Sequence, residues 1–271
     1  MRQILSALCV FAIGVLLPSV ATADSIFLDI RGITGETPTP GHPDALAAQS
    51  VTVVPDGFSA VRRVDSASPQ IANAVVTANV FPGATILFYN GTPAASPVAT
   101  LPFQNVIATS FQLLSGGINP LEQDSFASGT HYSMFLELPG ITGDASTPGH
   151  PGIMAIQSFA LEDQHFSVVR QPDSATPDIA LAVTTGRSLP NASIFFYDPG
   201  PTGTLVTTLI FEDVVATSFH IDGIISPLET DGFAFANLTA PTVQGVSEPA
   251  SALLLIAGVC LLSLLVRNTP A

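Results

Sequence analysis

The segment "VRRVDSASPQIANAV", residues Val61–Val75, occurs twice in this chain. Shifting the sequence by 108 positions places it on "VRQPDSATPDIALAV", residues Val169–Val183. The same register holds without a gap from "GITG" at 32–35 to "ATSF" at 108–111, and "PLE" follows after one deletion. A match this long indicates two tandem repeats of one domain, each of ordinary domain size. We place them at residues 24–130 and 131–239 and call them the first and second repeats.

Each copy of the segment predicts a short helix. Ser68 and Thr176 stand directly before a proline, and residues rich in Ala, Ile and Val follow. Proline suits the first helical turn because its missing N–H would be unpaired there, and the hydroxyl can cap a free N–H. We expect helices over Gln70–Ala78 and Asp178–Thr185.

The remaining patterns predict strands. Period-2 alternation of apolar residues is typical of half-buried strands, and short continuous apolar runs are typical of buried ones. The expected strands of the two repeats are Ser25–Arg31 and Ser133–Leu138, Ala84–Tyr89 and Ser193–Tyr197, and Val106–Leu113 and Val214–Ile221. In the last pair, the shared apolar faces would be Ile107, Phe111 and Leu113, and Val215, Phe219 and Ile221. The fold class is mainly β with one short helix per repeat, packed as a small barrel or sandwich.

Histidines offer the first candidates for chemistry. His42 and His150 occupy equivalent Gly-His-Pro triplets in loops, whereas His131, His165 and His220 have no counterparts in the register. A metal site needs three or four converging ligands, so we interpret the two triplets as structural loops, with metal or acid–base chemistry as the alternative. We predict no metal site and no cofactor.

Carboxylates are the second set of candidates. Asp65 and Asp173 precede the two helices, where a nucleophile is conceivable but stabilisation of the turn and the helix end is favoured. Glu122 and Glu229 are an equivalent pair, and glycoside hydrolysis would need two carboxylates facing each other across a cleft. No recognised hydrolase or phosphate-binding motif occurs. We therefore predict no catalytic residue and a protein that is not an enzyme.

The first 23 residues predict a secretory signal peptide. Arg2 precedes an apolar run over 4–17, and an Ala-Thr-Ala sequence ends at Ala23. We expect cleavage between Ala23 and Asp24, with a permanent N-terminal anchor as the alternative. Secretion of the mature chain follows from this interpretation.

Residues 250–271 predict a membrane tail. Ala250–Val266 is apolar, and at 1.5 Å per residue it would span about 25 Å as a helix. Arg267 follows it and would remain cytoplasmic, which places the two repeats outside the membrane. A buried core helix is the alternative. Residues 240–249 form a linker.

Charge and cysteine content exclude further classes. The chain has no lysine, and setting aside Arg2 and Arg267 leaves five basic residues against 21 acidic ones. A surface this acidic repels phosphate backbones, so we expect no nucleic-acid partner. Both cysteines, Cys9 and Cys260, lie in the end segments, so the repeats contain neither a disulfide nor a thiolate site.

The order of the motifs resembles a known family. The first repeat reads "FLDIRGITGETPTPGH", "VRRVDSASPQIANAV", "ATILFYN", "VIATSF" and "PLE", and the second reads "FLELPGITGDASTPGH", "VVRQPDSATPDIALAV", "SIFFYD", "VVATSF" and "PLE". These stretches are similar to Hcp, the tube protein of type VI secretion systems. The resemblance implies a β-barrel with a flanking helix that assembles into six-membered rings, and it carries no catalytic residue.

The end of the chain resembles a second family. The apolar run and its neighbours are similar to the PEP-CTERM sorting signal, which implies recognition by an exosortase and a place in the bacterial envelope or extracellular matrix. The residues that carry this resemblance are Ser247, Glu248, Pro249, Ala250, Ser251 and Arg267.

These interpretations lead to one leading hypothesis and two alternatives. We expect an exported, non-enzymatic structural protein that associates with itself, with three chains closing into one ring of six barrels. An extracellular carbohydrate-binding module is the first alternative, weakened by the absence of Trp and by only three Tyr. A hydrolase is the second.

Overall fold

The computed structural model describes residues 26–37, 39, 41–91, 96–115, 118–199, 203–223 and 226–239. The predicted signal peptide (1–23), linker (240–249) and membrane tail (250–271) therefore lie outside the described residues. Among the residues that are described, no helix is long and apolar enough to cross a membrane.

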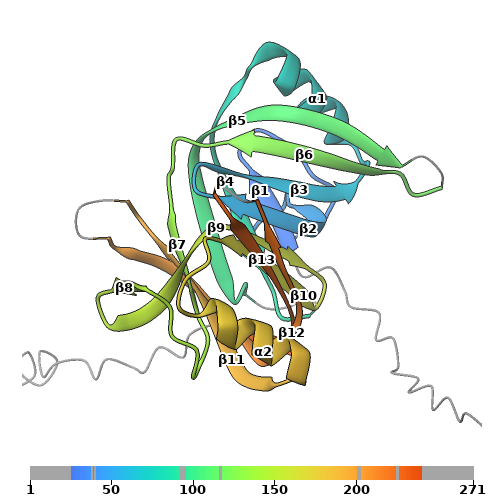
Figure 1. Ribbon diagram of the computed structural model, residues 1–271. Helices are drawn as coiled ribbons and strands as arrows, with labels where there is room; N and C mark the ends of the chain where they lie inside the picture. Colours follow the sequence, from blue (N-terminus) through green and yellow to red (C-terminus); the bar gives the residue numbers. More distant parts are fainter. Residues whose placement is uncertain are drawn as a thin grey trace, which may run out of the picture.

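The first repeat folds into a closed antiparallel barrel. Strands follow the order β1-β4-β5-β6-β3-β2, and β2 pairs back onto β1, so that six strands enclose one interior (Figure 1). The elements are β1 (Ile26–Ile30), β2 (Leu46–Val54), β3 (Gly57–Arg63), α1 (Ser68–Thr77), β4 (Val80–Phe88), β5 (Ala99–Ser115) and β6 (Leu121–Ala127).

The second repeat closes in the same way. Its strand order is β7-β11-β12-β13-β10-β9, and β9 pairs back onto β7. The elements are β7 (Ser133–Glu137), β8 (Ala145–Thr147), β9 (His150–Glu162), β10 (His165–Arg170), α2 (Thr176–Thr185), β11 (Ser188–Tyr197), β12 (Leu205–Asp222), β13 (Leu228–Ala234) and β14 (Asn237–Thr239). The prediction of a mainly β fold with one short helix per repeat is confirmed.

Alternating apolar side chains fill both barrels. On β1, Ile26, Leu28 and Ile30 point into the interior and are buried, as the period-2 pattern predicts. One continuous apolar core extends through both repeats. Tyr132 lies between them, with its ring edge-on to Phe103 at 5.4 Å and to Phe196 at 6.2 Å between ring centroids. Burial of this kind supplies most of the folding free energy, because the described residues contain no disulfide.

The predicted faces of the long strands β5 and β12 are wrong. Val106 and Ala108 are buried, whereas Leu113 is 61% exposed. A β-bulge explains the difference: the pairing with β6 shifts register between Ala108 and Ser110, which puts Ile107 on the opposite face from Phe111 and Leu113. An extra residue in a strand moves every later side chain to the other face. The second repeat has the same irregularity, since the pairing of β12 with β13 shifts register between Ala216 and Ser218.

Strands β2 and β9 join the two barrels into one sheet. They pair antiparallel, with Thr52 opposite Ala160 at the centre and Val51 opposite Leu161 beside them. Thr52 and Ala160 are also equivalent positions in the 108-residue register. Each repeat therefore contributes the same strand, and a local two-fold axis passes between Thr52 and Ala160.

This junction differs from the contact that a simple six-fold ring would use, and the ring of three chains stays a prediction. Neighbours in a ring contact each other through two different surfaces, one on each side of every subunit. The β2–β9 junction instead pairs the same strand with its own counterpart. A ring of three chains would therefore have to alternate this like-strand contact with a second contact between chains.

Candidate functional site

A buried arginine organises the polar interior of the first repeat. Arg62 lies near the end of β3 and is fully buried. Its Nε donates to Asp124 Oδ2 at 2.6 Å, its Nη1 donates to Asp65 Oδ1 at 2.7 Å, and its Nη2 forms an ion pair with Glu122. Ser68 Oγ donates to Glu122 Oε1 at 2.9 Å. We call Arg62, Asp65, Ser68, Glu122 and Asp124 the first charge cluster.

The second repeat contains the same arrangement. Arg170 Nε donates to Asp231 Oδ2 at 2.8 Å, its Nη1 donates to Asp173 Oδ1 at 2.6 Å, and its Nη2 pairs with Glu229. Thr176 Oγ1 donates to Glu229 Oε2 at 2.6 Å. These five residues form the second charge cluster, which ties α2 to β10 and β13 as the first cluster ties α1 to β3 and β6.

The helix starts are confirmed, but the predicted caps are wrong. Ser68 and Thr176 are the first residues of α1 and α2, and neither helix has a side-chain cap. Their hydroxyls accept instead from the backbone N–H groups of Asp65 and Asp173, at 2.9 and 3.0 Å. The reason is the buried glutamate of each cluster, which accepts a hydrogen bond from the hydroxyl and so orients the oxygen away from the helix.

Asp65 and Asp173 have the structural role that the sequence favoured for them. Asp65 Oδ1 accepts from the backbone N–H of Ala67 at 2.8 Å, and Asp173 Oδ1 accepts from Ala175 at 2.9 Å. Each carboxylate thereby holds the turn before its helix while it also pairs with the buried arginine. A nucleophile held in this way would lose both contacts on attack.

Each cluster places three carboxylates around one guanidinium. Burial raises the pKa of Glu122 and of Asp124, although Arg62 draws both pKa values down. In the second cluster burial raises the pKa of Asp231 to about 7, against the hydrogen bond from Arg170. The unpartnered oxygens Glu122 Oε2, Asp124 Oδ1 and Asp231 Oδ1 are buried without a hydrogen bond among the described residues. The pKa values of these three carboxyls therefore lie above the ordinary values of their side chains.

The clusters do not form a cleft with two facing carboxylates. Glu122 and Glu229, the candidates for glycoside hydrolysis, are fully buried in different barrels. Each binds its own arginine and has no access to a polymer outside. The chemistry available to this arrangement is structural: it fixes the start of a helix against the barrel wall.

The two Gly-His-Pro histidines also have equivalent partners. His42 Nδ1 lies 2.6 Å from Asp29 Oδ2, and His150 Nδ1 lies 3.3 Å from Glu137 Oε2. His150 also packs on the Phe195 ring, with 4.3 Å between centroids. These contacts fasten the loop at His42 and the start of β9 at His150 to the first strand of each barrel, so the prediction of a loop is wrong for His150. Among the described residues, no three His, Cys, Asp or Glu side chains come close enough together to bind a metal ion.

The sequence analysis missed the arginines and the aspartates that complete the clusters. Arg62 and Arg170 share one register position, as do the histidine partners Asp29 and Glu137. The sequence does contain a signal for these residues: an ionisable residue occurs at the same position of both repeats within an apolar strand. The predicted sorting residues Ser247, Glu248, Pro249, Ala250, Ser251 and Arg267, and the cleavage pair Ala23 and Asp24, lie outside the described residues.

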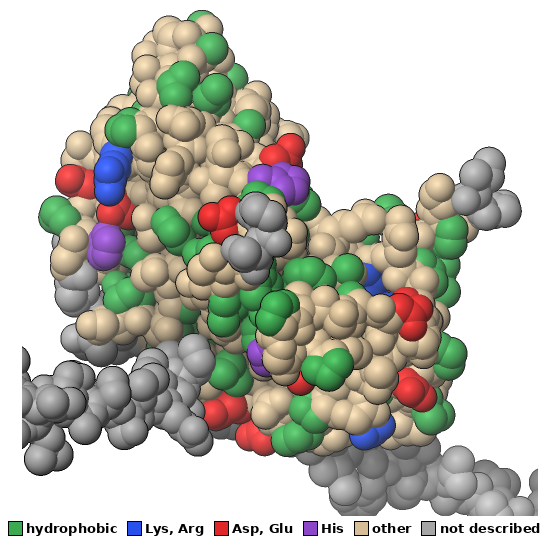
Figure 2. All heavy atoms as spheres, turned by 90° about the vertical axis from the view of Figure 1, so that its left-hand side faces the viewer, with side chains coloured by type: hydrophobic (Ala, Val, Ile, Leu, Met, Phe, Trp, Pro, Cys, Tyr) green, Lys and Arg blue, Asp and Glu red, His purple; other side chains and the backbone are tan. Residues whose placement is uncertain are grey.

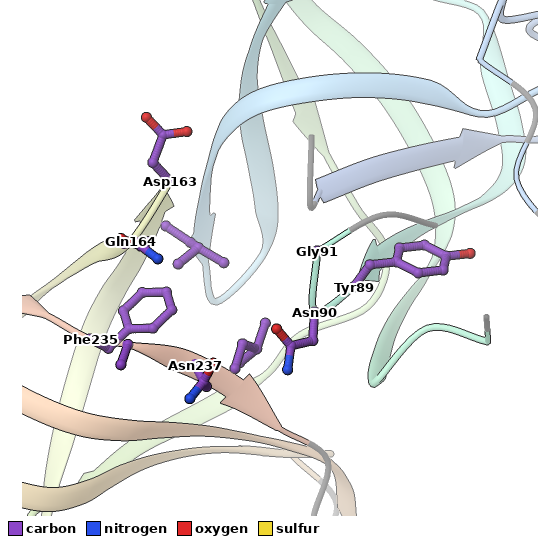
Figure 3. A pocket seen from close by; sticks show the side chains of 10 residues that line it. Tyr89, Asn90, Gly91, Asp163, Gln164, Phe235 and Asn237 are labelled. Atoms are coloured by element: carbon purple, nitrogen blue, oxygen red, sulfur yellow. The ribbon is translucent and has the colours of Figure 1, made fainter. Parts of the chain in front are cut away.

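A small cavity marks the seam between the repeats. Its volume is about 160 Å³, and amide side chains from Asn90, Gln164 and Asn237 line it. Figure 3 shows Asn90 of the first repeat across from Gln164 and Asn237 of the second, with the Tyr89 ring pointing away from them. Phe235 also lines the cavity but is itself buried. The cavity thus offers amides but no open aromatic face.

The surface that helix α1 forms on the first repeat is uncharged. Helix α1 contains no acidic or basic residue, and the crown of the upper lobe in Figure 2 shows only hydrophobic and other uncharged side chains. Among the described residues, every Phe and Tyr is buried or half-buried. The described surface therefore has no fully exposed aromatic ring on which a sugar could stack.

Comparisons with known proteins agree with this fold. Residues 135–241 match the family described as "Type VI secretion system effector, Hcp". No curated protein matches the chain. Similar solved structures include Hcp1 from Salmonella typhimurium, with 20% identity over 40% of this chain and 82% of that one and a TM-score of 0.37. A type VI secretion system effector from Yersinia pestis shows 20% identity over 39% and 85%, with a TM-score of 0.35.

Secreted protein Hcp3 from Pseudomonas aeruginosa is 19% identical over 41% of this chain and 88% of its own, with a TM-score of 0.35. Each of these proteins spans about the length of one repeat. The family match ends two residues beyond β14 and begins inside β7, so it covers the second barrel. Residues 135–241 are therefore similar to the Hcp family.

Proposed function

We propose that this chain is an exported, non-enzymatic structural protein of the bacterial envelope or extracellular matrix, built from two Hcp-like domains at 24–130 and 131–239. The observation that carries the proposal is the duplicated barrel: the second repeat matches the Hcp family, and the first has the same strand order and charge cluster. The buried charged groups of both barrels hold the helix starts in place. This arrangement favours a structural role over catalysis.

Export and sorting complete the proposed role. The signal peptide would direct the chain across the membrane, and cleavage after Ala23 would release its N-terminus. The tail at 250–271 would then hold the chain until an exosortase recognises the motif around Glu248 and Pro249. The acidic charge of the repeats supports a role outside the cell that involves neither nucleic acid nor anionic lipid. Self-association is part of the proposal, since Hcp-like barrels build assemblies.

The carbohydrate-binding alternative is less well supported. Sugar faces bind by stacking on exposed aromatic rings, and the described surface offers none. The cavity at the seam is small, and the two aromatic residues that line it, Tyr89 and Phe235, are both buried. No observation on the described residues favours a hydrolase.

Deleting Ala250–Ala271 is expected to move the protein from the membrane fraction to the culture medium. The deletion removes the apolar run that would span the membrane, while the signal peptide still directs export. Cell fractionation and immunoblotting give the distribution, and mass spectrometry of the released chain should find Asp24 at its N-terminus. As a control, the Ser247→Ala variant keeps the whole apolar run, so its uncleaved chain should stay in the membrane fraction. A truncated chain that still pellets with membranes contradicts the anchor.

A further inference from the structure

One sheet runs from edge to edge through both repeats. Its strand order is β5-β6-β3-β2-β9-β10-β13-β12, and the β2–β9 junction lies at its centre. The outer ends of β5 and β12 form the two margins, because β4 stops pairing with β5 at Ile107 and β11 stops pairing with β12 at Val215. The local two-fold axis relates one margin to the other. Figure 1 shows β5 at the margin of the upper barrel, beside β6.

The β5 margin is a largely exposed edge, although α1 contacts β5 and a β-bulge lies at each end of the edge segment. Among the described residues, Ser110–Leu113 pairs with β6 on one side and with no strand on the other, and Thr109 and Leu114 are bulge residues at its two ends. Its sequence "TSFQLL" contains no charge and no proline. Leu113 and Leu114 are 61% and 44% exposed, and α1 leaves Gln112 exposed as well. Natural proteins protect such edges with charges, prolines or covering segments, because free N–H and C=O groups pair with other chains.

The β12 margin carries charged side chains that β5 lacks. The equivalent positions of Gln112 and Leu114 are His220 and Asp222. These two side chains are paired at 3.0 Å between Nε2 and Oδ1 and are 69% and 79% exposed. A strand that docked on this edge would place its side chains against the His220–Asp222 pair. Docking would remove water from these charged groups, which costs free energy. The repeats have therefore diverged at the position where a new strand would be added.

We propose that the β5 edge pairs antiparallel with the β5 edge of a second copy of this chain. The new contact continues the same sheet and repeats, about a true two-fold axis, the pairing that β2 and β9 already make within the chain. Because the β12 edge is charged, a dimer presents no further open edge and growth stops at two chains. This inference deepens the proposed structural role and rests on it.

Net charge acts against the dimer and gives it a salt dependence. Five basic and 21 acidic residues remain once Arg2 and Arg267 are set aside, so the two chains repel each other at long range. The contact itself is made by backbone groups and uncharged side chains. Added salt screens the repulsion without weakening the pairing, so dimerisation should strengthen as ionic strength rises.

Exchanging the two edges tests the proposal. The variant Gln112→His/Leu114→Asp gives β5 the residues of β12, and the variant His220→Gln/Asp222→Leu gives β12 those of β5. Each substitution places a residue that the other repeat already accepts in the same strand. The full chain is purified in detergent, and light scattering measures its mass at several protein and salt concentrations. Circular dichroism and the melting temperature confirm folding, and Leu114→Lys is a second variant that blocks the same edge.

The proposal predicts three different masses. The wild-type chain should be a dimer, with a dissociation constant that falls as salt increases, and Gln112→His/Leu114→Asp should halve the mass. His220→Gln/Asp222→Leu should give particles larger than a dimer that grow with protein concentration. Equal masses for the wild type and both β5 variants overturn the pairing, and a mass limited to the dimer in the β12 variant overturns the role of the charged pair. Export and anchoring are measured separately by fractionation, so failure of the dimer leaves those results unaffected.

Discussion

Replacing Arg170 by alanine is expected to lower the free energy of unfolding by about 3–5 kcal/mol. The guanidinium is fully buried and pairs with Asp173, Glu229 and Asp231. Without it, three carboxylates would remain close together in a dry interior with no cation. Protonation relieves part of this cost, but the hydrogen bonds that hold the start of α2 are lost as well.

Denaturant unfolding followed by circular dichroism measures this loss. Arg187→Ala is the matched control, because Arg187 is exposed and has no side-chain hydrogen bond or ion pair among the described residues. Arg62→Ala should reproduce the effect in the first repeat, where the cluster has the same geometry. A loss below about 1 kcal/mol for Arg170→Ala, similar to that of an exposed ion pair, would refute the structural role of the cluster.

The second large effect concerns pH and Asp231. Burial raises the pKa of this carboxyl to about 7 in the folded protein, whereas an unfolded aspartate titrates near 3.9. The folded state therefore binds more protons between about pH 4 and pH 7. The stability that this group contributes is fully present below the lower value and is lost as the pH rises through about 7.

Asp231→Asn removes this titration. Asparagine can keep the acceptor for Arg170 Nε and place its amide nitrogen where Oδ1 has no partner. The melting temperature of the variant relative to wild type should therefore increase as the pH rises from 4 to 8. Asp178→Asn, on the exposed surface of α2, is the control and should show no such trend. A difference for Asp231→Asn that is constant across this range would contradict the raised pKa.

Local patterns predicted the elements of the fold but not their irregularities. The Ser-Pro and Thr-Pro pairs located both helix starts, because the constraints on proline act within one turn. The caps failed because the partner of Ser68 is Glu122, 54 positions away, which no local rule contains. The prediction of the β5 face failed because the bulge between Ala108 and Ser110 is one residue long and interrupts an otherwise regular alternation.

The candidate site shows the same limit. The repeat register paired Asp65 with Asp173 and Glu122 with Glu229. In the structure, one member of each pair belongs to the first charge cluster and the other to the second. Arg62 and Arg170 were missed because arginine side chains are ordinarily exposed in proteins, and these two are buried only because the barrel closes around them. The β2–β9 junction could not be predicted, since Thr52 and Ala160 have no chemical feature that specifies a partner.

The most direct test of the two-fold junction is a disulfide between Thr52→Cys and Ala160→Cys. These positions lie directly opposite each other across β2 and β9, and both side chains are half-buried. In a full chain whose Cys260 is replaced by serine, the two cysteines come within disulfide range if the repeats pair about this axis. We predict that mild oxidation forms the bond within single chains, seen as a loss of about two mass units in the intact monomer. Free thiols, or bonds that form only between chains, would contradict the pairing of the two repeats.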